Sequence, residues 1–111
     1  MTSFTATSFR ESQELEAHAA LLSALGHPVR LQIVDGLLQE GCCVGSMVEC
    51  LGLPQPLISR HLAILRKAEV VDVDPEGRFR RYRVVHPDAE RVVRLLLGPA
   101  PVGSGQGERD E

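Results

Sequence analysis

The sequence has few aromatic residues: its 111 residues include three phenylalanines, one tyrosine and no tryptophan. Because 43% of the residues are hydrophobic, we expect one small domain whose core is built from aliphatic side chains. Long apolar runs are also missing. No stretch of about 18 apolar residues occurs, which argues against a transmembrane helix and a membrane partner.

The first residues lack the basic start and apolar stretch that mark a secretory signal. Cysteine is scarce, and three cysteines form neither an even set nor the spaced pairs of a secreted disulfide scaffold. We therefore expect a cytoplasmic protein with reduced thiols. A small thiol reductase would need a Cys-x-x-Cys pair, a βαβ pattern or a cofactor loop, and none occurs, so the sequence does not predict an enzyme.

The net charge of −3 offers no general attraction to nucleic acid, but the charge is unevenly distributed. Residues 1–53 carry two basic and six acidic side chains, a charge of −4. Residues 54–86 carry seven basic and four acidic side chains, a charge of +3, and residues 87–111 carry −2. Because phosphate responds to local charge, the middle segment is the candidate nucleic-acid-binding region.

Residues 53–71, LPQPLISRHLAILRKAEVV, predict an amphipathic helix. Ile58, Leu62 and Leu65 are spaced by four and three residues and therefore share one helical face. The two prolines of LPQP suit a first helical turn, where missing N–H groups need no partner. Residues 51–53, LGL, indicate a tight break after a short helix. This arrangement predicts a helix-turn-helix, whose second helix enters the DNA major groove.

The remaining pattern adds three earlier helices, a wing and a last helix. Apolar periodicity predicts the earlier helices at residues 12–25, 28–40 and 44–51. β-branched residues predict strands at 70–73 and 79–85, with a turn at 74–77 that contains Pro and Gly. The last helix begins near residue 86, and its apolar residues at positions 92, 93 and 95–97 favour a partner over solvent.

The predicted fold is therefore mainly α with a small β-hairpin wing, a winged helix-turn-helix in the order α-α-α-α-β-β-α. We expect the DNA-binding and dimerisation domain to span residues 12–97. Residues 1–11 are predicted to be disordered, and residues 98–111, GPAPVGSGQGERDE, to form a flexible tail.

Three runs recur in an order and at a spacing that carry a family resemblance: LSALGHPVRLQIVDGLL at 22–38, the helix segment at 53–71, and EGRFRRYRVV at 76–85. Together they resemble the ArsR/SmtB family of bacterial winged-helix repressors over roughly residues 21–97. The resemblance implies a homodimer built by the first and last helices, which occupies a promoter and leaves it when an effector binds. A dimer predicts an imperfect palindrome as the operator.

Polar residues of the helix at 53–71 are the candidate contacts with double-stranded DNA. Gln pairs bidentately with adenine and Arg with guanine, while Ser reaches a base edge or a phosphate, so we assign groove contacts to Gln55, Ser59 and Arg60. Arg78 and Arg80, just past the wing turn, are candidates for phosphate or minor-groove contacts. One alternative is that these residues are only the polar face of a solvated helix. Another is that the winged helix is used purely for protein–protein contact.

Other charged and polar residues of this region are expected to be structural. Arg81 and Arg83 are candidates for sheet-surface charges, and His61 is predicted to be a hydrogen-bonded histidine at the edge of the apolar face. The histidines at positions 18, 27 and 86 are expected in turns or on the surface. The last helix lacks the Asp-x-His and His-x-x-Glu pattern of the family's interfacial zinc site, so zinc is not expected there.

Cys42 and Cys43 are the candidate effector site. In arsenic- and metal-responsive relatives a Cys-Val-Cys motif precedes the recognition helix; Cys43 falls on its first cysteine, whereas Gly45 replaces the second. The adjacent thiols, near a helix N-terminus that favours thiolate, could bind a thiophilic species such as trivalent arsenic or antimony. They could equally close a strained and readily reduced vicinal disulfide, or be structural while another effector acts. No cofactor is required.

Cys50 is predicted to be a small buried core residue rather than a third ligand. If a helix starts near residue 44, Cys50 lies about 10 Å along its axis from Cys43, at about 1.5 Å per residue. Three thiolates around one soft ion must lie much closer together than that.

Overall fold

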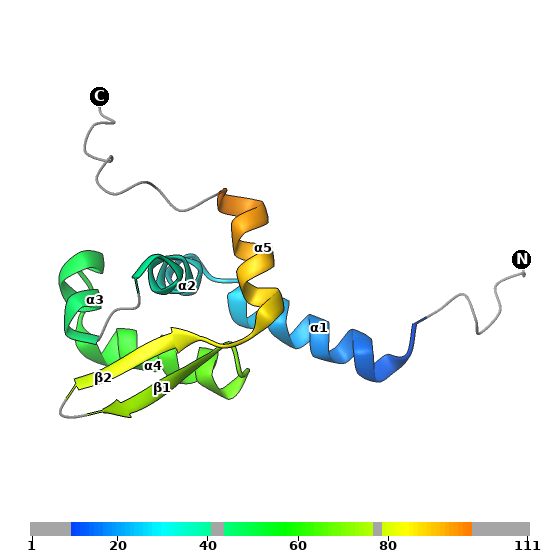
Figure 1. Cartoon of the computed structure of the whole chain (residues 1–111), viewed down its shortest axis with the longest axis horizontal. Coiled ribbons are helices and arrows are strands. Elements are labelled where there is room, and N and C mark those ends of the chain that lie inside the picture. The colour runs from blue at the N-terminus through cyan, green and yellow to red at the C-terminus, as the bar shows by residue number, and fades with distance from the viewer. Residues whose placement is uncertain (1–9, 41–43, 77–78, 99–111) are drawn as a thin grey trace, which may run out of the picture.

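The computed structural model describes residues 10–40, 44–76 and 79–98 (Figure 1). Its elements are, in order, α1 (Ser12–Leu25), α2 (Pro28–Glu40), α3 (Val44–Leu51), α4 (Gln55–Lys67), β1 (Val71–Glu76), β2 (Phe79–Val84) and α5 (Pro87–Leu97). The predicted order of helices and strands is confirmed. Most of the predicted disordered segment and flexible tail lies outside the described residues, so those two predictions stand as predictions.

The core is aliphatic and is centred on α4. Ile58, Leu62 and Leu65, the three residues that share one face of this helix, are almost completely buried. They pack within one cluster with buried residues of α1, α2, α3, the β hairpin and α5. The predicted apolar face is therefore confirmed, and α4 is fixed to the domain along one side only, which leaves its other side exposed.

The turn before α4 requires an unusual backbone conformation. Gly52 has φ +67°, a left-handed conformation that a glycine adopts without steric cost. Its N–H donates to the Val48 carbonyl at 2.9 Å and ends α3. Pro54, the N-cap residue of α4, is extended, and its carbonyl accepts from the Ile58 N–H at 3.2 Å. The break predicted at residues 51–53 is confirmed.

Two other helices start with a His-Pro pair. The Nδ1 atom of His27 accepts from the N–H of Val29 at 3.1 Å, at the start of α2. His86 accepts in the same way from the N–H of Asp88 at 3.1 Å, at the start of α5. Each histidine satisfies a donor that has no partner inside its helix. Both are turn residues, as the sequence predicted.

The wing is an antiparallel hairpin in which Val71 is opposite Val84 and Glu76 is opposite Phe79. The predicted turn at residues 74–77 was placed too early, because β1 continues through Asp74, Pro75 and Glu76. Proline is tolerated here because a two-stranded sheet leaves one side of each strand without a ladder partner. In Figure 1 the hairpin lies along α4, whereas α1 extends away from it at the other end of the domain.

Candidate nucleic-acid interface

The exposed side of α4 carries the three residues assigned to groove contacts. Gln55 is the first residue of the helix, and Ser59 and Arg60 lie on its next turn; all three are exposed. Their side chains are exposed, whereas the apolar residues of the same helix are buried in the core cluster, so the core holds the backbone that presents them. Polar side chains on the N-terminal turns of a supported helix match the geometry with which a recognition helix reads base edges.

A groove separates the exposed side of α4 from β2. Its lining residues come from the helix and from one tyrosine of the wing: Ser59, Leu62, Ala63, Arg66, Lys67 and Tyr82. Ser59, Ala63 and Lys67 follow one another at four-residue steps, so they form a line along the helix. Tyr82 was not singled out from the sequence as a residue that lines this groove. Its alternation with Val84 along the strand would have indicated that its ring faces inward.

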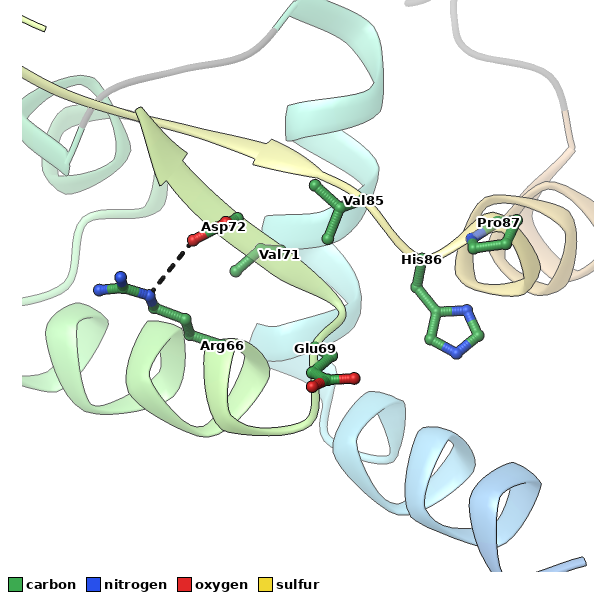
Figure 2. A pocket seen from close by; sticks show the side chains of 7 residues that line it. All are labelled: Arg66, Glu69, Val71, Asp72, Val85, His86 and Pro87. Atoms are coloured by element: carbon green, nitrogen blue, oxygen red, sulfur yellow. Dashed lines mark ion pairs between the residues drawn. The ribbon is translucent and has the colours of Figure 1, made fainter. Parts of the chain in front are cut away.

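Carboxylates of β1 hold two of the arginines in this region. Arg66 Nε lies 3.4 Å from an Asp72 oxygen, and Figure 2 shows the two side chains directed toward each other from α4 and β1. Arg83 Nε donates to both oxygens of Asp74, at 3.1 and 3.2 Å. Both pairs are exposed and contribute little to stability, but they fix where the guanidinium groups point. Arg83 is thus a sheet-surface charge, as predicted.

The remaining basic side chains near α4 are differently placed. Within residues 10–40, 44–76 and 79–98, neither Arg60 nor Lys67 forms an ion pair. Arg80 lies on β2 with its backbone opposite Pro75, whereas Arg78 is outside the described residues. The exposed side of α4 therefore presents two unpaired cations, while the arginine contacts predicted for the wing remain predictions.

A second exposed surface, on α1 and α5, has the opposite chemistry. Leu22 of α1 is 57% exposed and Leu95 of α5 is 82% exposed. They line one hollow together with Leu21 and Val92 and with three polar residues, His18, Asp88 and Arg91, so the two helices share this surface. Leu15, Leu96 and Leu97 are also exposed. Apolar side chains gathered in this way usually mark a contact with another protein.

The cysteines gave one incorrect prediction. Cys50 is exposed, not buried, on the last turn of α3. The buried side of α3 is formed by Met47 with Val48 and Leu51, and Cys50 lies beside it, over a groove between α3 and α2. The α2 side of this groove includes Gly36, where an added Cβ would meet no atom within 4 Å. Cys42 and Cys43 lie outside the described residues.

His61 is buried, as predicted for a structural histidine, and Arg30 NH1 lies 3.1 Å from its Nδ1. Burial lowers the pKa of His61, and the nearby charges of His27, Arg30 and Arg60 lower it further. The ring is therefore neutral near pH 7. Sequence reasoning did not find Arg30, because no local spacing relates residues 31 positions apart.

The described part of the chain contains no group of three or more His, Cys, Asp or Glu residues arranged to hold a metal ion. None of its helices is both long enough and apolar enough to cross a membrane.

The sequence matches a known family and several individual proteins. The family profile described as bacterial regulatory protein, arsR family, matches residues 27–73. The HTH-type transcriptional repressor SmtB of Mycobacterium tuberculosis is 42% identical over 79 residues, which are 71% of this chain but only 58% of SmtB. The transcriptional repressor PagR of Bacillus anthracis is 33% identical over 87 residues, or 78% of this chain and 87% of PagR.

Solved structures agree with these matches. The crystal structure of PagR superposes with a TM-score of 0.72 and covers 78% of this chain and 99% of the PagR chain. The homodimeric winged helix-turn-helix DNA-binding domain of Mb0332 from Mycobacterium bovis superposes with a TM-score of 0.70 at 27% identity. It covers 78% of this chain and 83% of that domain. The hairpin next to α4 is therefore the wing of a winged helix-turn-helix.

Proposed function

The chain belongs to the arsR family of bacterial regulatory proteins, which are transcriptional regulators, and on that basis we propose that it represses transcription by binding an operator in double-stranded DNA. The observation that carries the proposal is the exposed side of α4. Gln55, Ser59 and Arg60 are exposed there, and no carboxylate among the described residues neutralises Arg60. Gln and Arg read adenine and guanine through paired hydrogen bonds.

The operator is bound by a homodimer, for which the apolar surface of α1 and α5 supplies the contact. Its exposed leucines are the kind of surface that a second copy of the chain covers. The related Mb0332 domain is homodimeric. Two recognition helices about 34–36 Å apart would enter successive major grooves, so the operator is an imperfect palindrome.

Release from DNA is controlled by the thiols of Cys42 and Cys43. These residues immediately precede α3 in the sequence, and α3 packs against α4. Oxidation by a peroxide would join the two sulfurs and transfer two electrons and two protons to the oxidant, whereas trivalent arsenic would form two S–As bonds and release two waters. Either change at the start of α3 would tilt α4 and spoil the match of the two recognition helices to DNA.

Cys50 has no part in this switch. It lies on the last turn of α3, and the helical rise of about 1.5 Å per residue separates it from residue 43 by about 10 Å. Its side chain lies at a groove between α3 and α2.

The test of DNA binding uses the purified, reduced protein and a labelled fragment from upstream of its own gene. The affinity is measured at several salt concentrations. Each phosphate that the protein neutralises adds about −0.9 to the slope of log affinity against log salt. A steep negative slope and preference for one fragment are expected. Absence of binding, or binding that ignores salt, would instead indicate a winged helix that contacts only proteins.

The test of the switch adds trivalent arsenic or hydrogen peroxide to the protein–DNA complex and records the intact mass. Release with loss of about two mass units, reversed by dithiothreitol, identifies a disulfide; release with bound arsenic identifies chelation. Cys42→Ser and Cys43→Ser should bind DNA and resist release, while the control Cys50→Ser should respond as the wild type does. If the first two variants are released normally, the thiols are structural and the effector acts elsewhere.

A further inference from the structure

Arg30, on the first turn of α2, forms hydrogen bonds to two other helices. Its Nε donates to the carbonyl oxygen of Ala24 at 2.6 Å, on the last turn of α1. Its NH1 lies 3.1 Å from Nδ1 of His61, in α4. The Ala24 carbonyl is among the last four of α1, which have no partner within their own helix. One guanidinium therefore ties the end of α1 to the middle of α4.

The contact fixes the protonation state of His61. A guanidinium only donates hydrogen bonds, so Nδ1 of His61 must accept, and the ring proton is on Nε2. The side chain is 7% exposed, which leaves little water to solvate a charged ring. The groups whose charge acts on it are His27 in the α1–α2 turn, Arg30 on α2 and Arg60 on α4 itself, and each is a base.

His27 reinforces this arrangement. Its ring centroid lies 4.6 Å from that of His61, with the rings tilted by 48°. Because its Nδ1 accepts from the Val29 N–H, the ring is held at the start of α2. Protonation of His61 would thus place a new cation between an arginine and a second histidine, with no carboxylate among the charges that act on it.

We propose that Arg30 is a positioning residue for the recognition helix: it holds α4 against the last turn of α1 by donating to neutral His61, so that operator binding depends on His61 remaining neutral. This inference rests on the proposed DNA-binding function. It adds a physical connection between the helix that presents the apolar surface and the helix that reads DNA. The position of α1 and the direction of Gln55 and Arg60 then depend on the same guanidinium.

The inference predicts an unusual response to acid. Protonation of histidines generally strengthens DNA binding, because each adds a positive charge near phosphate. Here protonated His61 carries a proton on Nδ1 and repels Arg30, so the operator affinity should fall. If only the neutral form binds, linkage limits the fall to about tenfold for each pH unit below the pKa of His61 in the free protein. The opposite signs distinguish the two effects.

The decisive variant is His61→Asn. The amide oxygen of asparagine lies near the place of Nδ1, so it can accept from Arg30, but it does not titrate. We would measure operator affinity between about pH 8 and about pH 5.5 at fixed salt. The wild type should lose affinity toward low pH, and His61→Asn should not. The control His86→Asn alters the corresponding His-Pro pair of α5, where asparagine is also a good cap, and should follow the wild type.

A second measurement requires no DNA. In the wild type, acidification should shift the backbone amide NMR signals of Gln55 and of residues 57–60 with the titration of His61. In His61→Asn these signals should not move, and in Arg30→Lys, which keeps the charge but lacks the forked donors, they should already be displaced at pH 8. If the wild type binds no operator at any pH, the proposed function fails and these shifts alone judge the inference. Unmoved signals, or an equal loss of affinity in His61→Asn, would overturn it.

Discussion

Two exposed surfaces of this domain differ in chemistry although both are formed by helices. The outward side of α4 presents amide, hydroxyl and guanidinium groups from Gln55, Ser59 and Arg60, whereas α1 and α5 present leucines. A polar, cationic surface is stable in water and gains a partner only where that partner is anionic. An apolar surface of this kind is unfavourable in water and favours any matching apolar surface. The two surfaces therefore predict two different partners, DNA and a second copy of the chain.

The surfaces also differ in how the domain supports them. Behind the exposed side of α4 lie Ile58, Leu62 and Leu65, which are almost completely buried. The last turn of α5 has no such support: its buried residues, Ala89 and Val93, lie earlier in the helix, and residues 95–97 are exposed. The DNA-facing surface is thus complete within one chain. We propose that a second copy of the chain completes the apolar surface.

The strongest test of this comparison is Leu95→Glu. A carboxylate in place of the most exposed leucine of α5 should prevent dimerisation, because an unpaired charge would be buried at the contact. Operator affinity should then fall by about 100-fold or more, since the second half-site no longer adds avidity. Light scattering gives the mass and fluorescence anisotropy the affinity. Ala20→Glu, an exposed residue on another side of α1, should remain dimeric. A dimeric Leu95→Glu protein would place the contact elsewhere.

A second test separates two arginines near the DNA-facing surface. Arg60→Ala should lower the affinity for the specific operator by about tenfold to a hundredfold, because a bidentate base contact contributes about 1–3 kcal/mol of discrimination. Affinity for unrelated DNA should change much less. Arg83→Ala removes the same charge from a side chain already bound to Asp74 and should have a small effect on both. Equal losses on specific and unrelated DNA would make Arg60 a phosphate contact instead.

A third test concerns stability rather than partners. The pKa of folded His61 is lowered from 6.5, first by burial and then by neighbouring bases. His61 therefore binds a proton at a higher pH in the unfolded chain than in the folded one. The stability that neutral His61 contributes is fully present above pH 6.5 and is lost as the pH falls through the pKa of the folded state. Urea unfolding should show the wild type losing stability relative to His61→Asn over that window. Parallel pH profiles would mean that His61 is not the responsible group.

The sequence predicted those parts of the molecule that follow from local periodicity. The buried side of α4 and the bounds of α3 required only the spacing of apolar residues. Cys50 was wrongly predicted to be buried, because its exposure at the groove between α3 and α2 depends on how these helices pack, which local periodicity does not give. The Arg30–His61 contact is equally non-local. The exposure of Cys50 and the contact of Arg30 with His61 both depend on residues that are close in the fold but distant in the sequence.

The smallest predicted effect concerns the two left-handed residues that flank α4. Gly52 before the helix has φ +67°, and Glu69 after it has φ +63°. Glu69 lies where the Val70 N–H donates to the Leu65 carbonyl at 2.9 Å, a helix end that usually contains glycine. A residue other than glycine loses about 1–2 kcal/mol of stability when it adopts this conformation. Glycine avoids that loss, but part of the gain is offset because glycine makes the unfolded chain more flexible.

Glu69→Gly should therefore raise the free energy of unfolding by about 0.5–1 kcal/mol, whereas Gly52→Ala should lower it by about 1 kcal/mol. Urea denaturation of both variants gives the two signs. Figure 2 shows Glu69 at the end of α4, where it lines a hollow with residues of β1 and the start of α5. Glu69 is not among the residues that line the groove at Ser59 and Lys67. Dimerisation and operator affinity should consequently remain unchanged in Glu69→Gly. A loss of either would mean that a change at this end of α4 alters the proposed DNA surface or the proposed dimer surface. The two surfaces would then not be independent of it.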